Sequence, residues 1–448
     1  MASFKMTVPR TICAGFLALI VLGTALLCLP FSVVDGSTHP LVALFTATSA
    51  VCVTGLIVVD TGSYFSPLGQ VIILALIQVG GLGYMTATTF LLVILGRRLG
   101  LRDRLAIQQS MDTQELAGAK SLITSIIGMT LIFEISGIFG LFPTFSHDFG
   151  AGRGLWLSIF HSISAFNNAG FSLFPDSLVQ YVHAPGVNWV ITLLVIAGGI
   201  GYQVIMEAFL WLRDRVQGCC ERVVFSLHFK LVTSSTVLLL LAGTVMFFIA
   251  EHNNAATLAG FSLNDQLTAA WFQSVIARTA GFNSIDIGSM HDASLFFMVA
   301  LMFIGASPGS TGGGIKTTTA SILLICTRTV LRGKDEVLAY QREIPPARIL
   351  KAISVVVGSG GMVLGVTILI AFTSPDFRFL QVLFEAVSAF ATVGLSTGIT
   401  ADLSAISQLL IIATMYVGRV GVLLFMAALV GDHSPSLVRY PEEDLLVG

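Results

Sequence analysis

Uninterrupted apolar stretches long enough to cross a lipid bilayer recur along the whole chain. The first runs from Thr11 to Leu29. A helix needs about 20 such residues to cross the ~30 Å hydrocarbon layer. Only 11% of the residues are charged, whereas a soluble domain contains about 25%. The chain is therefore predicted to be an all-α integral membrane protein.

Eight membrane-spanning helices are predicted from the apolar pattern. Between alternate pairs of spans lies a shorter apolar segment, too short to cross the bilayer and typical of a re-entrant half-helix. The predicted spans cover residues 11–34, 67–95, 121–145, 189–212, 228–250, 295–327, 351–373 and 404–430. The four predicted half-helices cover Leu41–Cys52, Leu155–Asn168, Gln266–Thr279 and Leu380–Thr392.

Lysine and arginine are distributed unequally between the two sets of loops. Only Arg153 and Arg378 lie in one set, and Arg278, Lys316 and Arg419 lie within the membrane region. The remaining 18 of 23 basic residues lie before the first span, between repeats or after the last span. Positively charged loops stay cytoplasmic. Both termini are therefore predicted to be cytoplasmic, with the half-helices entering from outside.

Each half-helix ends in a small-residue stretch that contains one glycine, and these glycines recur at intervals of 115, 111 and 113 residues. They are Gly55, Gly170, Gly281 and Gly394. A repeat of this kind predicts four tandem units around one central pore, each consisting of helix, pore half-helix, filter segment and helix. We expect the repeats to cover residues 1–100, 101–218, 219–334 (with a broken second helix) and 335–448 (with the C-terminal tail).

The glycine segments have the properties of a cation filter. Non-helical backbone at membrane depth is tolerated only where protein buries it or water bathes it. Four such segments around one axis can replace the hydration shell of K⁺ with carbonyl oxygens. Helix packing is the alternative role for any single glycine, but the near-constant spacing of all four favours the filter. The predicted ion-binding residues are Val53, Thr54, Gly55, Asn168, Ala169, Gly170, Thr279, Ala280, Gly281, Thr392, Val393 and Gly394.

A serine also recurs in the half-helices. We align Ser49, Ser164 and Ser388 with Ser274, the only feature that the third copy keeps. The glycine clusters at residues 80–83 and 198–201 are a further trace of the repeat, and we interpret them as helix-packing sites.

This arrangement resembles the Trk/Ktr/HKT superfamily of K⁺ transporters over nearly the whole chain, and the Ktr-type membrane subunits most of all. The fourth copy, Thr392-Val393-Gly394, reproduces the first three residues of the K⁺-channel filter sequence. The resemblance implies a K⁺-preferring transporter of the cell (inner) membrane, with K⁺ as the transported ion and Na⁺ as a candidate activator. It also implies a homodimer on a cytosolic regulator-of-K⁺-conductance (KtrA-type) ring, with adenine nucleotide bound to that partner and not to this chain.

The sixth predicted span is interrupted by one proline and five glycines between residues 305 and 314. Such a sequence cannot continue a helix, and a helix broken at membrane depth usually lines a cavity. A mere kink is the alternative, although one proline would suffice for that. The resemblance implies an intramembrane loop at 305–316 that obstructs the pore below the filter. The predicted gate residues are Gly305, Ser307, Pro308, Gly309, Ser310, Thr311, Gly312, Gly313, Gly314, Lys316 and Arg419.

Arg419 lies in the middle of the last span, and an intramembrane arginine is a functional candidate. The resemblance implies that it faces the pore near the gate. The alternative is a structural ion pair with Glu134 or Glu207. Arg278 ends the third half-helix, where a cation suits the helix C-terminus, so we predict a structural role for it.

Other classes of function are less consistent with the sequence. A secondary carrier of a cation or an organic solute also has broken helices, but usually two inverted repeats. An enzyme requires a polar catalytic cluster, and the eight histidines form no spaced motif with carboxylates; His161 and His228 are interpreted as helix-end residues. We predict neither enzymatic activity nor a covalent cofactor nor a metal site beyond K⁺. The net charge of −2 gives no basis for binding nucleic acid.

Overall fold

The computed structural model describes residues 7–83, 119–218 and 224–430. The regular secondary structure in this part of the chain is helical apart from one small hairpin, formed by β1 (Leu338–Ala339) and β2 (Arg342–Glu343). The helices in chain order are α1 (Val8–Leu27), α2 (Pro40–Val51), α3 (Thr61–Tyr64), α4 (Pro67–Leu82), α7 (Ala119–Phe149), α8 (Ala151–Phe166), α9 (Pro185–Ile200), α10 (Tyr202–Val216), α11 (Leu227–Glu251), α12 (Leu263–Ile276), α13 (Asp292–Phe303), α14 (Thr317–Val330), α15 (Pro346–Thr373), α16 (Phe379–Phe390), α17 (Ala405–Val420) and α18 (Val422–Val430). Short 3₁₀ turns cover Pro30–Ser32, Val179–Tyr181, Ile287–Ser289 and Thr400–Asp402.

Four of these helices are long and apolar enough to cross a membrane, and two bent pairs add up to two more spans. The four are α1, α7 from Ile123 onward, α11 and α15. Their outward surfaces carry large apolar side chains such as Ile132, Phe139 and Leu238, which are 70%, 74% and 65% exposed. An apolar surface of this kind is stable against lipid and not against water. The prediction of an all-α membrane protein is confirmed.

The second helices of the second and fourth predicted repeats depart from the expected continuous span. The predicted spans 189–212 and 404–430 are wrong as single helices, because the chain bends by 104° between α9 and α10 and by 96° between α17 and α18. The bends lie at Gly201 and Gly421, whose φ angles of 94° and 90° are left-handed and stop a right-handed helix. Span 67–95 is seen as α4 up to Leu82, and residues 84–95 lie outside the described ranges.

The half-helices are found close to their predicted positions, as α2, α8, α12 and α16. Proline at the first turn of α2 and a serine cap before α12 account for where those helices begin, since both satisfy or remove unpaired N–H groups. Each half-helix packs against the long helix that precedes it in the chain. Most residues in the C-terminal half of each are buried, so these short apolar helices end inside the bundle.

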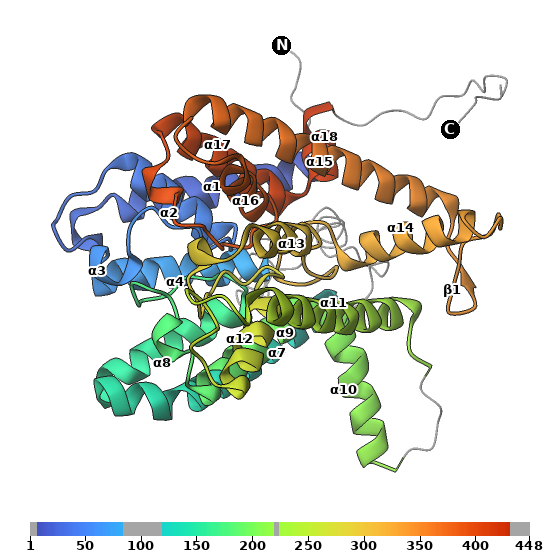
Figure 1. Cartoon of the computed structure of the whole chain (residues 1–448), viewed down its shortest axis with the longest axis horizontal. Helices are drawn as coiled ribbons and strands as arrows, with labels where there is room; N and C mark the ends of the chain where they lie inside the picture. The colour runs from blue at the N-terminus through green and yellow to red at the C-terminus, as the bar shows by residue number, and fades with distance from the viewer. Residues whose placement is uncertain (1–6, 84–118, 219–223, 431–448) are drawn as a thin grey trace.

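Contacts between the quarters of the chain close into a ring. Helix α4 packs on α8, α9 on α12, α13 on α16, and α17 returns to α2. Figure 1 shows the N-terminal helices lying beside the C-terminal helices α15 to α17. Each half-helix is thereby held between its own quarter and the preceding one. The ring directs the C-terminal ends of all four half-helices toward a common centre.

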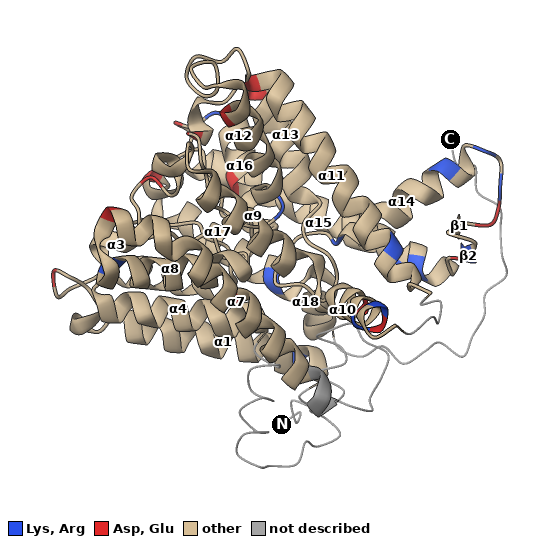
Figure 2. Ribbon diagram, turned by 90° about the horizontal axis from the view of Figure 1, so that it is seen from below, with Lys and Arg blue, Asp and Glu red and all other residues tan. Residues whose placement is uncertain are grey.

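Charged side chains are distributed mainly to two ends of the molecule. In Figure 2 most of the lysines and arginines lie near α10, α14 and the hairpin, whereas acidic residues gather near α3 and α12. The helices between these ends are almost free of charge in this view. This separation fits an apolar belt with a basic side and an acidic side.

Candidate functional site

The four glycine segments share one backbone conformation. The glycines have left-handed φ angles of 93°, 68°, 73° and 89° in chain order. Two residues before each glycine, a non-glycine residue is also left-handed: Val53 (55°), Asn168 (57°), Thr279 (77°) and Thr392 (50°). Left-handed angles cost roughly 1–2 kcal/mol for residues with a Cβ atom, so four equivalent occurrences show that the surrounding structure imposes this conformation.

The four glycines converge on one another. A Cβ atom built on Gly55 would lie 2.5 Å from the carbonyl oxygen of Ala169, and one on Gly170 would lie 2.8 Å from that of Ala280. The corresponding distances are 2.6 Å from Gly281 to Val393 and 2.1 Å from Gly394 back to Thr54. Each glycine therefore faces the residue that precedes the next repeat's glycine, and the series closes on itself. No side chain fits at any of the four positions without a backbone shift.

All twelve residues predicted as the filter are brought together at this ring, and the non-glycine members are completely buried. In three segments a serine of the half-helix holds the backbone. The Ser49 hydroxyl accepts a bond from the Gly55 N–H at 3.0 Å, Ser388 accepts from Gly394 at 3.1 Å, and Ser164 donates to the Phe171 carbonyl at 2.7 Å. These bonds fix the turn from helix to extended chain.

The third segment is held differently, and the alignment of Ser274 with these serines was wrong. Its hydroxyl donates to the Leu240 carbonyl on α11 at 2.7 Å, away from the filter segment. Val275 occupies the equivalent position, six residues before Gly281. The Thr279 hydroxyl instead lies 3.2 Å from the side-chain amide of Asn168 in the second segment. The ring is therefore only approximately fourfold.

Beneath the ring lies the non-helical segment that separates α13 from α14, residues 304–316. Its two ends are joined by a bridge between Ile304 and Ile315, so the segment between them folds back as a loop. Gly312 and Gly313 at its far side reach the filter: Cβ atoms built on them would lie 2.2 and 2.3 Å from the hydroxyls of Thr279 and Thr392. The predicted gate glycines thus lie directly against the first residues of two filter segments.

Helix α9 supports the other side of the loop. The Ser307 and Thr311 N–H groups donate to the carbonyls of Gly199 and Gly198, at 3.1 and 3.2 Å. Just after the bend, the Tyr202 N–H donates to the Gly309 carbonyl at 3.1 Å. The end of α9 leaves carbonyls without helical partners, and the loop satisfies them.

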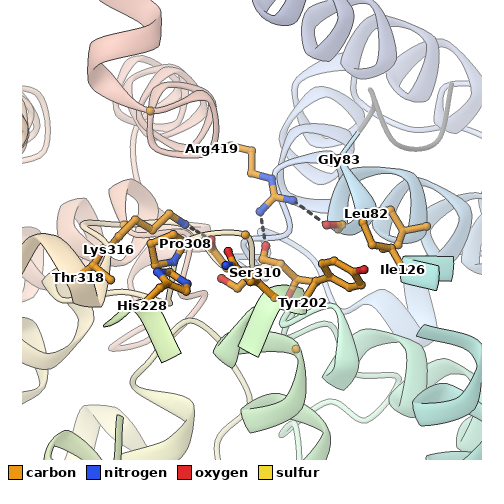
Figure 3. Close-up of a pocket in the computed structure, with 18 of the residues that line it drawn as sticks. Leu82, Gly83, Ile126, Tyr202, His228, Pro308, Ser310, Lys316, Thr318 and Arg419 are labelled. Atoms are coloured by element: carbon orange, nitrogen blue, oxygen red, sulfur yellow. Dashed lines mark hydrogen bonds between the residues drawn. The ribbon is translucent and has the colours of Figure 1, made fainter. Parts of the chain in front are cut away.

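Arg419 joins the loop to a different quarter of the molecule. Its guanidinium donates to the Thr311 carbonyl of the loop and to the Gly80 and Gly81 carbonyls at the end of α4. Figure 3 shows the side chain extending between these two elements, with Lys316 approaching the loop from the other side. The Lys316 ammonium donates to the Gly312 carbonyl at 2.7 Å. The cationic side chains of Arg419 and Lys316 are therefore both hydrogen-bonded to backbone oxygens beneath the glycine ring.

The alternative of an Arg419 ion pair with Glu134 or Glu207 is wrong. Glu207 accepts bonds from the N–H and hydroxyl of Ser226, at 3.1 and 2.7 Å, and Glu134 accepts from the Asn167 amide at 3.2 Å. Arg278 lies two residues beyond the end of α12, where the half-helix was predicted to continue, and is 8% exposed; its structural role stays a prediction.

A cavity of about 740 Å³ opens below the loop. The loop from Pro308 to Gly312 forms part of its wall, together with Arg419 and Lys316. Tyr202, His228, Arg348 and Lys351 also line it. The loop therefore borders this cavity and also lies against the filter segments at Thr279 and Thr392.

Comparison with known proteins identifies the family. The sequence profile of the TrkH family, described as "Cation transport protein", matches residues 10–436. The chain belongs to the TrkH family.

Individual relatives match over almost their whole length. The chain is 41% identical to "Ktr system potassium uptake protein B" of Bacillus subtilis, covering 99% of this chain and 97% of that one. It is 37% identical to "Potassium/sodium uptake protein NtpJ" of Enterococcus hirae, covering 99% and 98%. A solved structure, the potassium transporter TrkH from Vibrio parahaemolyticus, matches with a TM-score of 0.69 at 18% identity, covering 96% of this chain and 86% of that chain. At this identity the structural match supports the fold alone.

Two buried polar residues of this TrkH-family chain were not assigned to the site by sequence reasoning. His161 is wrong as a helix-end residue, because it lies inside α8, fully buried, with ring nitrogens 2.8 Å from the Leu157 carbonyl and 3.0 Å from the Ser172 hydroxyl. Glu385 lies in α16, also fully buried. Each is nine residues before its filter glycine, a shared spacing that marks them in the sequence.

The glycine clusters at residues 80–83 and 198–201 have two structural roles. Gly80 and Gly198 pack as predicted, since Cβ atoms there would lie 2.1 and 1.9 Å from carbonyls at the ends of α2 and α8. Gly83 and Gly201 instead have left-handed backbone and end their helices. The clusters thus combine close packing with a helix stop.

Proposed function

We propose that this chain is the pore-forming membrane subunit of a Ktr-type K⁺ uptake system. The proposal rests above all on the closed ring of four glycines, each facing the carbonyl that precedes the next glycine. The names of the relatives, which include a potassium uptake protein and a potassium/sodium uptake protein, are consistent with it. The predicted filter residues act in this proposal as the ion-binding site.

The backbone conformation of the filter segments supplies the chemistry. In an extended strand successive peptide groups point to opposite sides. Left-handed angles at the glycine and two residues before it break this alternation, so that consecutive carbonyls can turn to the same side. Carbonyl oxygens arranged in this way replace water around K⁺. The C-terminal ends of four half-helices add partial negative charge near the same point.

Residues 305–316 and Arg419 form the gate in this proposal. The loop lies between the filter and the cavity, and it is held by Arg419 from the fourth repeat and by α9 from the second. A K⁺ ion leaving the filter would meet the loop backbone and the positively charged side chains of Arg419 and Lys316. Opening requires the loop to leave Thr279 and Thr392, which in turn requires breaking its bonds to Arg419 or to α9.

Several further features are part of the same proposal and come from the family resemblance and the charge pattern. The basic side of the membrane belt is the cytoplasmic side of the cell (inner) membrane and carries both termini. Two copies of the chain assemble on a cytosolic KtrA-type ring that binds the nucleotide, and Na⁺ acts as an activator. The four repeats have the boundaries predicted above.

Uptake of K⁺ and Na⁺ by a K⁺-transport-deficient bacterium that expresses this chain, with a regulatory partner, tests the proposal. We expect wild type to restore growth at low external K⁺ and Gly281→Asp to abolish it, since a side chain at Gly281 meets the Val393 carbonyl. Membrane abundance is measured in parallel to separate lost transport from lost protein. Normal K⁺ uptake by an abundant Gly281→Asp protein would contradict the filter and favour a carrier mechanism.

A further inference from the structure

A buried carboxylate stands directly behind the fourth filter segment. Glu385 lies in the middle of α16 and is inaccessible to solvent. One of its oxygens accepts bonds from the Ser396 hydroxyl at 2.5 Å and the Thr397 N–H at 3.1 Å. The other accepts from the Thr400 hydroxyl at 2.9 Å. All three donors belong to the chain that leaves the filter, beginning two residues after Gly394.

These bonds organise the outer end of the segment. The Ser396 hydroxyl also lies 2.9 Å from the Thr400 hydroxyl and accepts from the Gly398 N–H at 2.9 Å. Gly398 is left-handed, with a φ angle of 93°, so the chain turns sharply here. A carboxylate can accept all three bonds at once because an ionised carboxyl is acceptor-only. The five residues from Ser396 to Thr400 are therefore gathered around one buried side chain.

Glu385 and Ser396 lie nine residues before and two residues after Gly394. The side chains at the equivalent positions are hydrogen-bonded to each other in only one other repeat. In the second repeat the residues nine before and two after the glycine are His161 and Ser172, whose side chains lie 3.0 Å apart. The first repeat has Thr46 and Ile57 at these positions, and the third has Phe272 and Asn283. Asn283 turns elsewhere, donating to the Ile285 carbonyl at 3.1 Å. Since the ring runs in chain order, the two joined segments lie opposite each other.

We propose that Glu385 is a positioning residue for cation selectivity, which holds the outer end of the fourth filter segment through Ser396, Thr397 and Thr400. The inference rests on the proposed filter. Carbonyls discriminate between K⁺ and Na⁺ only if their number and spacing around the ion are maintained. At their outer ends two opposite segments are tied to their half-helices, by His161 in the second repeat and by Glu385 in the fourth, and the fourth has the larger network. Loosening that network lets the ring contract around the smaller ion.

The test compares Glu385→Gln with Glu251→Gln. Glu251 is a matched control, since it is also fully buried and accepts three bonds, from Asn254, Thr257 and the His291 N–H, at 2.7, 2.7 and 3.0 Å. None of those partners belongs to a filter segment. Initial rates of K⁺ and Na⁺ uptake are measured as a function of ion concentration and normalised to membrane abundance. A purely structural residue changes abundance, whereas a positioning residue changes the ratio of the two ions.

We expect the preference for K⁺ over Na⁺ to fall about tenfold in Glu385→Gln, the effect of weakening a charge-assisted hydrogen bond. The ratio in Glu251→Gln should remain that of wild type. An unchanged ratio in Glu385→Gln, or an equal change in both variants, would overturn the inference. If Glu385→Gln does not reach the membrane, Thr400→Val removes one donor and leaves the carboxylate. We expect about a threefold fall there, and an unchanged ratio would equally overturn it.

The inference and the proposed function fail in different ways. Loss of K⁺ uptake in Gly281→Asp together with wild-type ion ratios in Glu385→Gln and Thr400→Val would leave the filter in place and reject the role of Glu385. Full K⁺ uptake by Gly281→Asp would reject the filter and this inference with it.

Discussion

The second helices of the repeats end at the same depth but in two different ways. Helices α9 and α17 each break at one left-handed glycine, Gly201 or Gly421, and α4 ends at Gly83 with the same backbone. Helix α13 instead gives way to a loop, residues 304–316, before α14 resumes. The breaks at Gly201 and Gly421 bend the chain by 104° and 96°, whereas the loop folds back against the filter segments at Thr279 and Thr392.

This difference separates two requirements on one chain. Coordinating a spherical ion from all sides requires four similar segments, and the filter backbone is repeated in all four quarters. Blocking the path requires only one element, and the proposed gate is a single loop, residues 304–316. The carbonyls of Gly198 and Gly199 bind the loop directly, and those of Gly80 and Gly81 bind Arg419, which in turn binds the loop.

Removing Arg419 should change the loop more than any single change at a helix break. We expect Arg419→Ala to raise K⁺ flux per molecule about tenfold, because charge-assisted hydrogen bonds to three carbonyls are lost. Uptake of radioactive Rb⁺ into proteoliposomes measures this flux. Arg419→Lys is the control: it retains the charge but cannot span the same carbonyls with a planar fork, and we expect an intermediate flux. Flux at or below wild type in Arg419→Ala would show that the arginine does not hold the loop closed.

The helix breaks themselves provide a smaller and sharper comparison. A Cβ atom at Gly201 would lie 2.6 Å from the Pro308 carbonyl of the loop, whereas one at Gly421 meets nothing within 4 Å. Both alanine variants have the left-handed strain of roughly 1–2 kcal/mol, and thermal unfolding should show a similar loss of stability. We expect only Gly201→Ala to displace the loop and to raise Rb⁺ flux, by about threefold. Equal flux changes in the two variants would mean that the change in Rb⁺ flux is caused by backbone strain at the alanine and not by contact with the loop.

The sequence was sufficient to predict the parts of this structure that recur. The half-helices and the glycines were located because four copies at nearly constant spacing cannot arise from packing alone. The loop was located because no helix continues through one proline and five glycines. Recurrence along the whole chain decides the first case, and the local chemistry of proline and glycine decides the second.

The parts that were missed have no distinctive pattern in the sequence. A single glycine inside an apolar stretch usually packs helices, so the breaks at Gly201 and Gly421 could not be told from packing sites. The partners of Arg419 are backbone carbonyls from two other elements, and carbonyls have no sequence signature. Glu385 and His161 are seen to occupy equivalent positions only when residues are counted back from the filter glycines. The half-helix boundaries alone do not align them.

The most direct test of the filter is to locate a heavy monovalent cation in an experimental structure of the protein prepared in Rb⁺ or Tl⁺. We expect anomalous density inside the ring, surrounded by the carbonyl oxygens of Thr54, Ala169, Ala280 and Val393, which the four glycines face. The density should disappear in Gly281→Asp. Density in the membrane region that lies away from this ring, with none inside it, would contradict the four-glycine filter.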